Sequence, residues 1–299
     1  MNKKLSLLFL SFALSAIVLT SCGSGTDDAN INGDDTTNVD NGGEKKSASF
    51  IFKSVPSTAE LAVMIKNAGA IYDFKLLNDV KNKDKYTTTT AKAMNLGVYG
   101  ADCSYASIFD QTNEMMFFIQ CAQSLAGSIG ASGAFDDATL DRVSQNKSNH
   151  DSVLSIKTDT YTITDQLLSE GGRSGVSALV VAGGWVEGLY IATNLANGTK
   201  NNAEIVKRIA EQKGSLKNLI ELLQENEDTE GVKAIISGLK DIQAAYEKVD
   251  QNTTAEVKNT DEKNKLTTLG GGNQMTLTKE QLAEITKTVG VLRASIVKP

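Results

Sequence analysis

The chain has 299 residues, enough for one large domain or two modest ones, and 40% of them are hydrophobic, as in globular proteins. With 36 acidic and 30 basic side chains its formal net charge is −6, so it lacks the basic surplus of a nucleic-acid-binding protein and we expect no nucleic-acid partner. One histidine and three cysteines exclude most zinc sites and a disulfide-dense module. No metal site, cofactor site or catalytic residue is predicted.

Residues 1–21 are predicted to be a signal peptide. A pair of lysines precedes an apolar stretch at 5–19 that is too short to span a membrane as a helix. The sequence Leu19-Thr20-Ser21-Cys22 that follows resembles the lipobox of bacterial lipoproteins. The resemblance implies that Cys22 is diacylated at sulfur, becomes the mature N-terminus and anchors the chain to a membrane, since two or three acyl chains hold a protein stably. The alternative is an ordinary signal peptide that happens to contain a cysteine.

Residues 22–54 are predicted to be a flexible tether after the lipidated cysteine. They are rich in Gly, Asp, Asn, Ser and Thr, and six acidic residues precede the first base, Lys45. Such a composition cannot bury enough apolar surface to fold. The acidic run is similar to the surface-export signal of Bacteroidetes lipoproteins, which implies an outer-membrane lipoprotein displayed on the cell surface. The alternative is an outer-membrane lipoprotein that faces the periplasm.

Residues 55–299 are predicted to form a single all-α domain. The only prolines are Pro56 and Pro299, and apolar residues recur three and four positions apart through most of the stretch between them. This spacing and the short connections predict about eight or nine helices in antiparallel hairpins, closed into a bundle or stacked as a short solenoid. A polar segment at 251–276 is predicted to be a long loop before a last helix that begins at the capping box Thr278-x-x-Gln281.

The most apolar segment of this domain, at 176–196, is long enough to be considered as a membrane span. Glu187 lies near its middle, where an ionised group is expensive in lipid. Gly183, Gly184 and Gly188 would let another helix approach closely. We therefore expect a central core helix of a water-soluble domain, with Glu187 buried in it.

Two carboxylates stand alone on apolar helices. Glu187 is the only charged residue at 174–199, and Asp102 is the only one at 93–109. Burial would raise the pKa values of both groups, and nothing in the sequence places them near each other. One interpretation is a small-molecule pocket lined by Asp102, Trp185, Glu187 and Tyr190. The other is structural: each carboxylate is hydrogen-bonded to a tyrosine or a lysine of a neighbouring helix.

Cys103 and Cys121 lie on two successive predicted helices, and the midpoint between them falls close to the predicted turn at Asp110-Gln111. In an antiparallel hairpin this places them at similar heights, and an exported protein meets an oxidising compartment, so a disulfide is one possibility. The other is a pair of buried thiols that pack as small apolar groups.

The stretches Met94–Asp102 and Gly183–Tyr190 look like signatures of the all-helical lipoproteins common in Bacteroidetes, which the whole chain resembles. The resemblance implies a cell-envelope location and an all-α fold, and it assigns no catalytic residue. The predicted function is that of a membrane-anchored lipoprotein whose helical domain binds an unidentified protein partner or has a structural role, without enzyme activity. The alternative is a lipoprotein that binds a small molecule in a central pocket.

Overall fold

The computed structural model describes residues 58–200, 202–247, 260–261, 266–267 and 276–299, all within one compact unit, Lys45–Pro299. The predicted signal peptide, Cys22 and the tether lie outside the described residues. The described residues are mostly helical, which confirms the predicted all-α fold. Their nine α-helices are α2 (Thr58–Asn67), α3 (Thr89–Ile108), α4 (Thr112–Ser128), α5 (Asp137–Asn146), α6 (His150–Glu170), α7 (Ser174–Gly198), α8 (Ala203–Gln224), α9 (Val232–Glu247) and α10 (Lys279–Val297). Short 3-10 helices lie in the connections: η1 (Phe74–Leu76), η2 (Val80–Lys85) and η3 (Ser132–Phe135).

Several helix ends follow from local side-chain chemistry. The capping box predicted for the last helix is confirmed: Thr278 Oγ1 accepts a hydrogen bond from the Gln281 backbone N–H, and Gln281 Oε1 accepts one from the Thr278 N–H. At the start of α3, Thr88 Oγ1 accepts from the Ala91 N–H. The α3–α4 turn falls at the predicted position, and Asp110 adopts a φ of 61° there.

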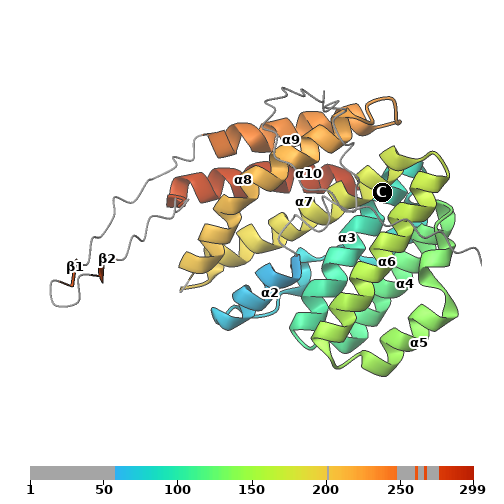
Figure 1. Ribbon diagram of the computed structural model, residues 1–299, viewed down its shortest axis with the longest axis horizontal. Coiled ribbons are helices and arrows are strands. Elements are labelled where there is room, and N and C mark those ends of the chain that lie inside the picture. Colours follow the sequence, from blue (N-terminus) through green and yellow to red (C-terminus); the bar gives the residue numbers. More distant parts are fainter. Residues whose placement is uncertain (1–57, 201, 248–259, 262–265, 268–275) are drawn as a thin grey trace, which may run out of the picture. The chain divides into compact units, whose positions relative to one another are not determined.

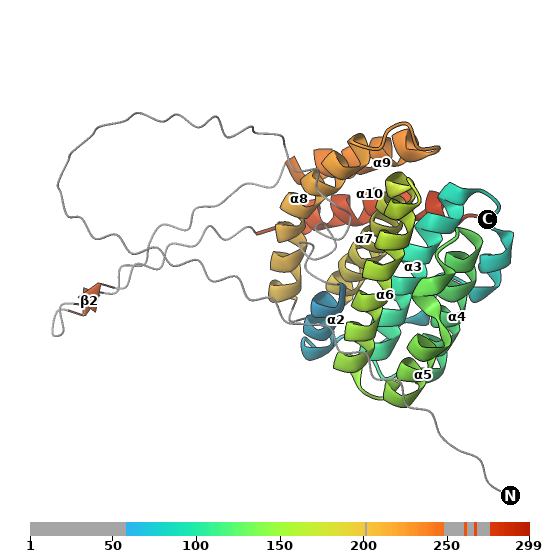
Figure 2. The ribbon, with the colours of Figure 1, turned by 45° about the vertical axis from the view of Figure 1, so that its right-hand side comes forward.

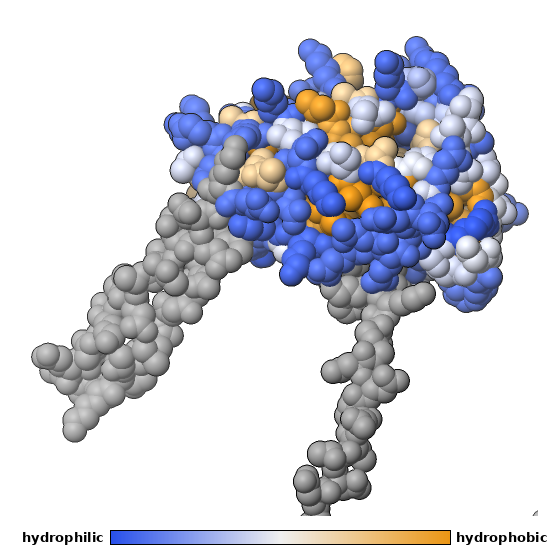
Figure 3. Space-filling view, turned by 90° about the horizontal axis from the view of Figure 1, so that it is seen from above, coloured by the Kyte–Doolittle hydropathy of each residue, from blue (hydrophilic) through white to orange (hydrophobic). Residues whose placement is uncertain are grey.

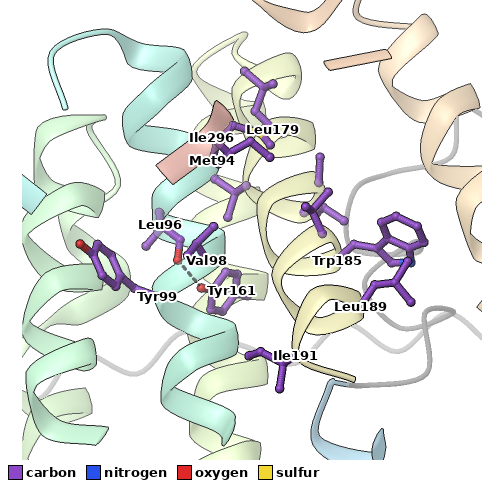
Figure 4. Close-up of a cluster of buried hydrophobic side chains, with 14 of the residues drawn as sticks. Met94, Leu96, Val98, Tyr99, Tyr161, Leu179, Trp185, Leu189, Ile191 and Ile296 are labelled. Atoms are coloured by element: carbon purple, nitrogen blue, oxygen red, sulfur yellow. Dashed lines mark hydrogen bonds between the residues drawn. The ribbon is translucent and has the colours of Figure 1, made fainter. Parts of the chain in front are cut away.

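The centre of the domain is the contact between α3 and α7, which lie side by side in Figures 1 and 4. A Cβ atom added at Gly97 would lie 2.0 Å from the carbonyl oxygen of Val180, and one added at Gly183 would lie 1.9 Å from that of Met94. The two helices therefore touch backbone to backbone, an approach that only glycine permits. Thr229 lies against Gly175 at the start of α7, and Gly231 lies against Thr90 at the start of α3. Both helices therefore begin at the same segment and cross while running in the same direction.

The other helices pack on either side of this central pair. Figures 1 and 2 place α4 and α5 beyond α3, and α8, α9 and α10 beyond α7, whereas α6 packs on both α3 and α7. Two pairs of successive helices each form the expected antiparallel hairpin: the rings of Tyr99 and Phe118 stack between α3 and α4, and Tyr246 Oη donates to the carbonyl oxygen of Ile209 between α9 and α8. Because α10 returns to both α7 and α3, the hairpins close into a bundle rather than a solenoid.

Helix α7 is the one helix among the described residues that is long and apolar enough to cross a membrane by length and composition. In the structure, 89% of its most apolar 18-residue window is buried inside the domain. This burial agrees with the predicted core helix, and Glu187 is fully buried, as predicted.

The predicted loop at 251–276 contains two short strands, β1 (Thr260–Asp261) and β2 (Leu266–Thr267). They pair antiparallel, with Thr260 opposite Thr267 and Asp261 opposite Leu266. Most of the remaining loop residues lie outside the described part of the chain, so the long loop stays a prediction.

Candidate functional site

The buried Glu187 carboxylate is paired with an arginine from the last helix. Arg293 Nε and Nη2 each donate a hydrogen bond of 2.9 Å, one to each carboxylate oxygen of Glu187. Arg293 Nη2 also donates to the carbonyl oxygen of Leu76 at 3.0 Å, and the guanidinium lies 4.7 Å from the ring centre of Tyr190. The side chains of Glu187 and Arg293 are 0% and 13% exposed, so this two-point, charge-assisted pair is largely shielded from water.

Asp102 on α3 completes the cluster. Its Oδ2 accepts a hydrogen bond of 3.1 Å from the Asn78 backbone N–H, whereas its buried Oδ1 receives none from any N–H group. Burial raises the pKa of Asp102 well above its usual value, and the neighbouring negative charge of Glu187 raises it further, against the opposing effect of Arg293. The Asp102 carboxyl group is therefore the harder of the two to ionise, and the interaction between the two carboxyl groups raises the pKa of Asp102 and lowers that of Glu187.

The charge balance of the cluster follows from this arrangement. Burial raises the pKa of Glu187, and the Arg293 guanidinium opposes that shift through hydrogen bonds and charge. One guanidinium can neutralise one carboxylate, so the second carboxyl group, that of Asp102, keeps its proton. The three side chains together carry no net charge, which is the condition under which ionisable groups tolerate burial.

A second layer of hydrogen bonds ties the cluster to the end of α10. Asn78 Nδ2 donates to Tyr86 Oη and to Asn95 Oδ1, both at 3.0 Å. Asn95 Nδ2 donates to the carbonyl oxygen of Ile296 at 2.9 Å, and Tyr86 Oη donates to that of Val297 at 3.0 Å. The network thus joins the segment around η1 and η2 to α3 and to the last turn of α10.

Three of the four predicted pocket residues lie together, and the fourth, Trp185, lies on the opposite side of α7. Asp102, Glu187 and Tyr190 gather around Arg293, since positions 187 and 190 lie on one face of a helix. The placement of Trp185 in this group is wrong, because a residue two positions from Glu187 projects to the opposite side of the helix. Trp185 Nε1 donates to Gln212 Oε1 on α8 at 3.3 Å, and Figure 4 shows the indole pointing away from α3.

The two internal cysteines are free thiols, and the structure contains no bridge between them. Cys121 Sγ lies 3.8 Å from the carbonyl oxygen of Val80 in η2, whereas Cys103 lines a cavity on the other side, next to α6. Burial raises the pKa of Cys103 to about 12 and that of Cys121 to about 11. Of the two alternatives, the structure has the pair of buried thiols and not the disulfide.

Sequence reasoning missed Arg293 and the asparagines Asn78 and Asn95. A signal for Arg293 was present, because it directly follows Leu292 and stands four positions after Val289, beside the apolar stripe of the last helix. A basic residue in that position is a candidate partner for a buried acid on another helix. Asn78 lies in an irregular segment, where no periodicity marks a buried side chain.

The arrangement leaves little scope for chemistry at this cluster. Each oxygen of Glu187 accepts from Arg293, and Asp102 Oδ2 accepts from the Asn78 N–H, while both carboxyl groups are fully buried. Among the described residues, no group of three or more His, Cys, Asp and Glu side chains is placed to hold a metal ion. Comparisons of this chain with protein-family models, with curated proteins and with solved structures gave no significant match.

Proposed function

We propose that this protein is a bacterial cell-envelope lipoprotein, anchored in the outer membrane through Cys22, whose helical domain has a structural or partner-binding role. The lipobox Leu19-Thr20-Ser21-Cys22 at the end of a short apolar stretch supports the anchor, and the acidic run behind it supports display at the cell surface.

The observation that carries a role without catalysis is the neutralised cluster of Asp102, Glu187 and Arg293. General acid–base catalysis needs a carboxyl group within hydrogen-bond reach of a substrate. Here Glu187 is fully buried and is held at two points by Arg293, and Asp102 is fully buried against it. The cluster fits a device that fixes α10 against α3 and α7 better than it fits a ligand pocket.

Two exposed apolar side chains support a partner-binding role. Ile71 is 84% exposed and Phe74 is 64% exposed, both in the connection between α2 and α3. Tyr72 between them is fixed in place, since its ring stacks on Tyr105 and its hydroxyl donates to Glu114. A separate face of the domain, seen from above in Figure 3, also presents apolar side chains bordered by hydrophilic ones. Ile71 and Phe74 are therefore the apolar side chains of this segment that another protein would contact.

The anchor is tested by replacing Cys22 with alanine and following labelled fatty acid in the producing cells. We expect the Cys22→Ala chain to lose the label and to leave the membrane fraction, because the acyl chains supply the membrane affinity. Cys103→Ala serves as the matched control and should keep both label and location. Continued labelling and membrane retention of Cys22→Ala would overturn the anchor.

The partner-binding role is tested by mild crosslinking of intact cells that carry the wild-type chain or the double variant Ile71→Ser, Phe74→Ser. We expect a discrete crosslinked complex with the wild-type chain and its loss in the double variant. Val291→Ser is the control, since Val291 is 67% exposed on α10. A complex that persists in the double variant would exclude this segment as the binding surface.

A further inference from the structure

A cavity lies between α3, α4, η3, α5 and α6, away from the Glu187 cluster. Its surface is almost wholly apolar and includes Ile119 and Ala122 from α4, Phe135 from η3 and Val143 from α5. Its volume is about 30 Å³, and one water-sized group needs roughly 10–15 Å³ of such space, so two or three groups of that size fit. Voids larger than one water molecule are few in a protein interior.

Three polar side chains of the lining already have hydrogen-bond partners in the protein. Thr160 Oγ1 donates to a backbone carbonyl of its own helix, and Tyr161 Oη donates to the carbonyl oxygen of Leu96, both at 2.8 Å. Lys157 is the one charged lining residue, and its Nζ donates at 2.7 Å to Ser104 Oγ, which does not line the cavity. Lys157 therefore contributes its methylene stem to the wall.

A wall of this kind selects its occupant by polarity. Water would give up the hydrogen bonds of the bulk liquid and find few partners inside, and apolar cavities therefore stay dry. An ionised group would lose its hydration without gaining a counter-ion at the wall. An alkyl group leaves water favourably and gains dispersion contacts with the lining.

The side of the cavity formed by α5 provides the entrance. Val143 is the one buried residue among the ten of α5, and Figures 1 and 2 show this helix at the edge of the domain. An exposed ion pair of 3.0 Å between Arg142 and Asp159 joins α5 to α6, and such pairs contribute little stability. A helix with so few buried contacts opens at low cost. The partly exposed Leu140 and Lys157 mark the opening between α5 and α6.

We propose that this cavity is a binding site for an alkyl group of two or three carbons, which enters between α5 and α6. The volume sets the limit of two or three carbons, and the apolar wall sets the preference for hydrocarbon. The alkyl group belongs either to a small free molecule or to the end of a longer aliphatic chain, since both offer the same chemistry to the wall. The site does not depend on lipidation of Cys22.

The test is a titration of the full chain with dissolved propane, followed by NMR spectroscopy of isotope-labelled methyl groups. We expect the methyl signals of Val143, Val153 and Ile156 to shift and to reach saturation. Val289 on α10 is the internal reference, because it is fully buried and lies outside the lining, and its signals should stay in place. Unshifted signals at the three lining residues, or equal shifts at Val289, would overturn the proposal.

Two substitutions test the size of the site. Ala122→Leu adds three carbons to the wall, so the propane-induced shifts at Val153 and Ile156 should be lost. Val143→Ala removes two carbons and should admit neopentane, which is too large for the wild-type cavity. Val291→Ala is the matched control, because Val291 is 67% exposed on α10, and it should bind propane and exclude neopentane as the wild type does. Saturable binding of neopentane to the wild type would overturn the size limit, as would propane shifts that persist in folded Ala122→Leu.

Octanoate separates the two sources of the alkyl group. Its carboxylate stays in water while the end of its chain can reach the cavity. Saturating shifts of the same methyl signals by octanoate would support the end of an aliphatic chain as the ligand. Shifts by propane and none by octanoate would support a small free hydrocarbon, and shifts by neither compound would overturn the site.

Discussion

Arg293 on α10 donates two parallel hydrogen bonds to Glu187 on α7, a residue 106 positions earlier in the chain. The pair joins the last helix of the chain to the central one, and Asp102 adds α3 to the same contact. A buried ion pair contributes little net stability compared with apolar side chains of the same shape, but removal of one partner leaves an uncompensated charge. Variants that each change one residue of this cluster should therefore differ sharply in their free energy of unfolding.

The variant Arg293→Met should be the most damaging change in the cluster. It leaves the Glu187 carboxylate buried without a counter-ion, which costs about 3–5 kcal/mol of unfolding free energy. Glu187→Gln should cost less, because Asp102 can then release its proton and become the counter-ion of Arg293. Urea unfolding of both variants at pH 7 measures the difference in unfolding free energy. An equal or larger loss of unfolding free energy in Glu187→Gln would contradict the assignment of the proton to Asp102.

Asp102 should make the domain less stable as the pH rises. Its pKa is raised in the folded state, so the folded chain holds a proton that the unfolded chain releases above about pH 4. Stability should therefore fall as the pH climbs from about 4 towards the folded-state pKa. Thermal unfolding between pH 4 and pH 8 measures this slope.

Asp102→Asn should flatten that slope, because an amide keeps a donor towards Glu187 and does not titrate. The variant should gain stability relative to the wild type as the pH rises. The exposed Asp241 supplies the control, and Asp241→Asn should leave the slope unchanged. The comparison stays below pH 8, because burial lowers the pKa of Lys157 to about 8 in the folded chain. Above that pH the unfolded chain holds a proton that the folded chain has released, so the contribution of Lys157 to the free energy of unfolding rises with pH. An unaltered slope in Asp102→Asn would refute the protonated carboxyl group.

The contact between α3 and α7 should not tolerate a methyl group at its centre. Gly183→Ala would place a Cβ atom 1.9 Å from the Met94 carbonyl oxygen, a fixed backbone atom, so the helices must separate at a cost of about 1–3 kcal/mol or more. Gly214→Ala on α8 is the matched control, since a Cβ there meets nothing within 4 Å. It should raise the unfolding free energy by roughly 0.5–1 kcal/mol through helix propensity. Chemical denaturation gives the unfolding free energy of both variants. Destabilisation of similar size in the two would contradict the close backbone contact between α3 and α7.

The two internal cysteines should stay reduced and react slowly in the folded protein. Both are buried, and their pKa values are raised to about 12 and about 11, so little thiolate exists at pH 8. A thiol reagent should label Cys103 and Cys121 only after denaturation. Measurement of the intact mass tests for the opposite outcome, a disulfide between Cys103 and Cys121, which would lower the mass by about 2 Da.

Much of the local structure is determined by the sequence alone. The three-and-four spacing of apolar residues predicts the helices, Thr278 and Gln281 mark the start of α10, and an isolated Glu187 in an apolar helix predicts a buried carboxylate. These features depend on residues within a few positions of one another. Hydrogen bonding within a turn and the 3.6-residue period therefore suffice to predict them.

The partners of the buried groups were decided by the tertiary structure. The glycines at 183 and 184 indicate a close helix approach, but α7 is apolar on nearly every face. Nothing local therefore identifies α3 as the partner or the parallel direction of the crossing. That crossing brings Asp102 to Glu187, and α10 then supplies Arg293 from the far end of the chain. Periodicity reports which residues are buried, but the choice of partner depends on shape and charge complementarity between helices far apart in sequence.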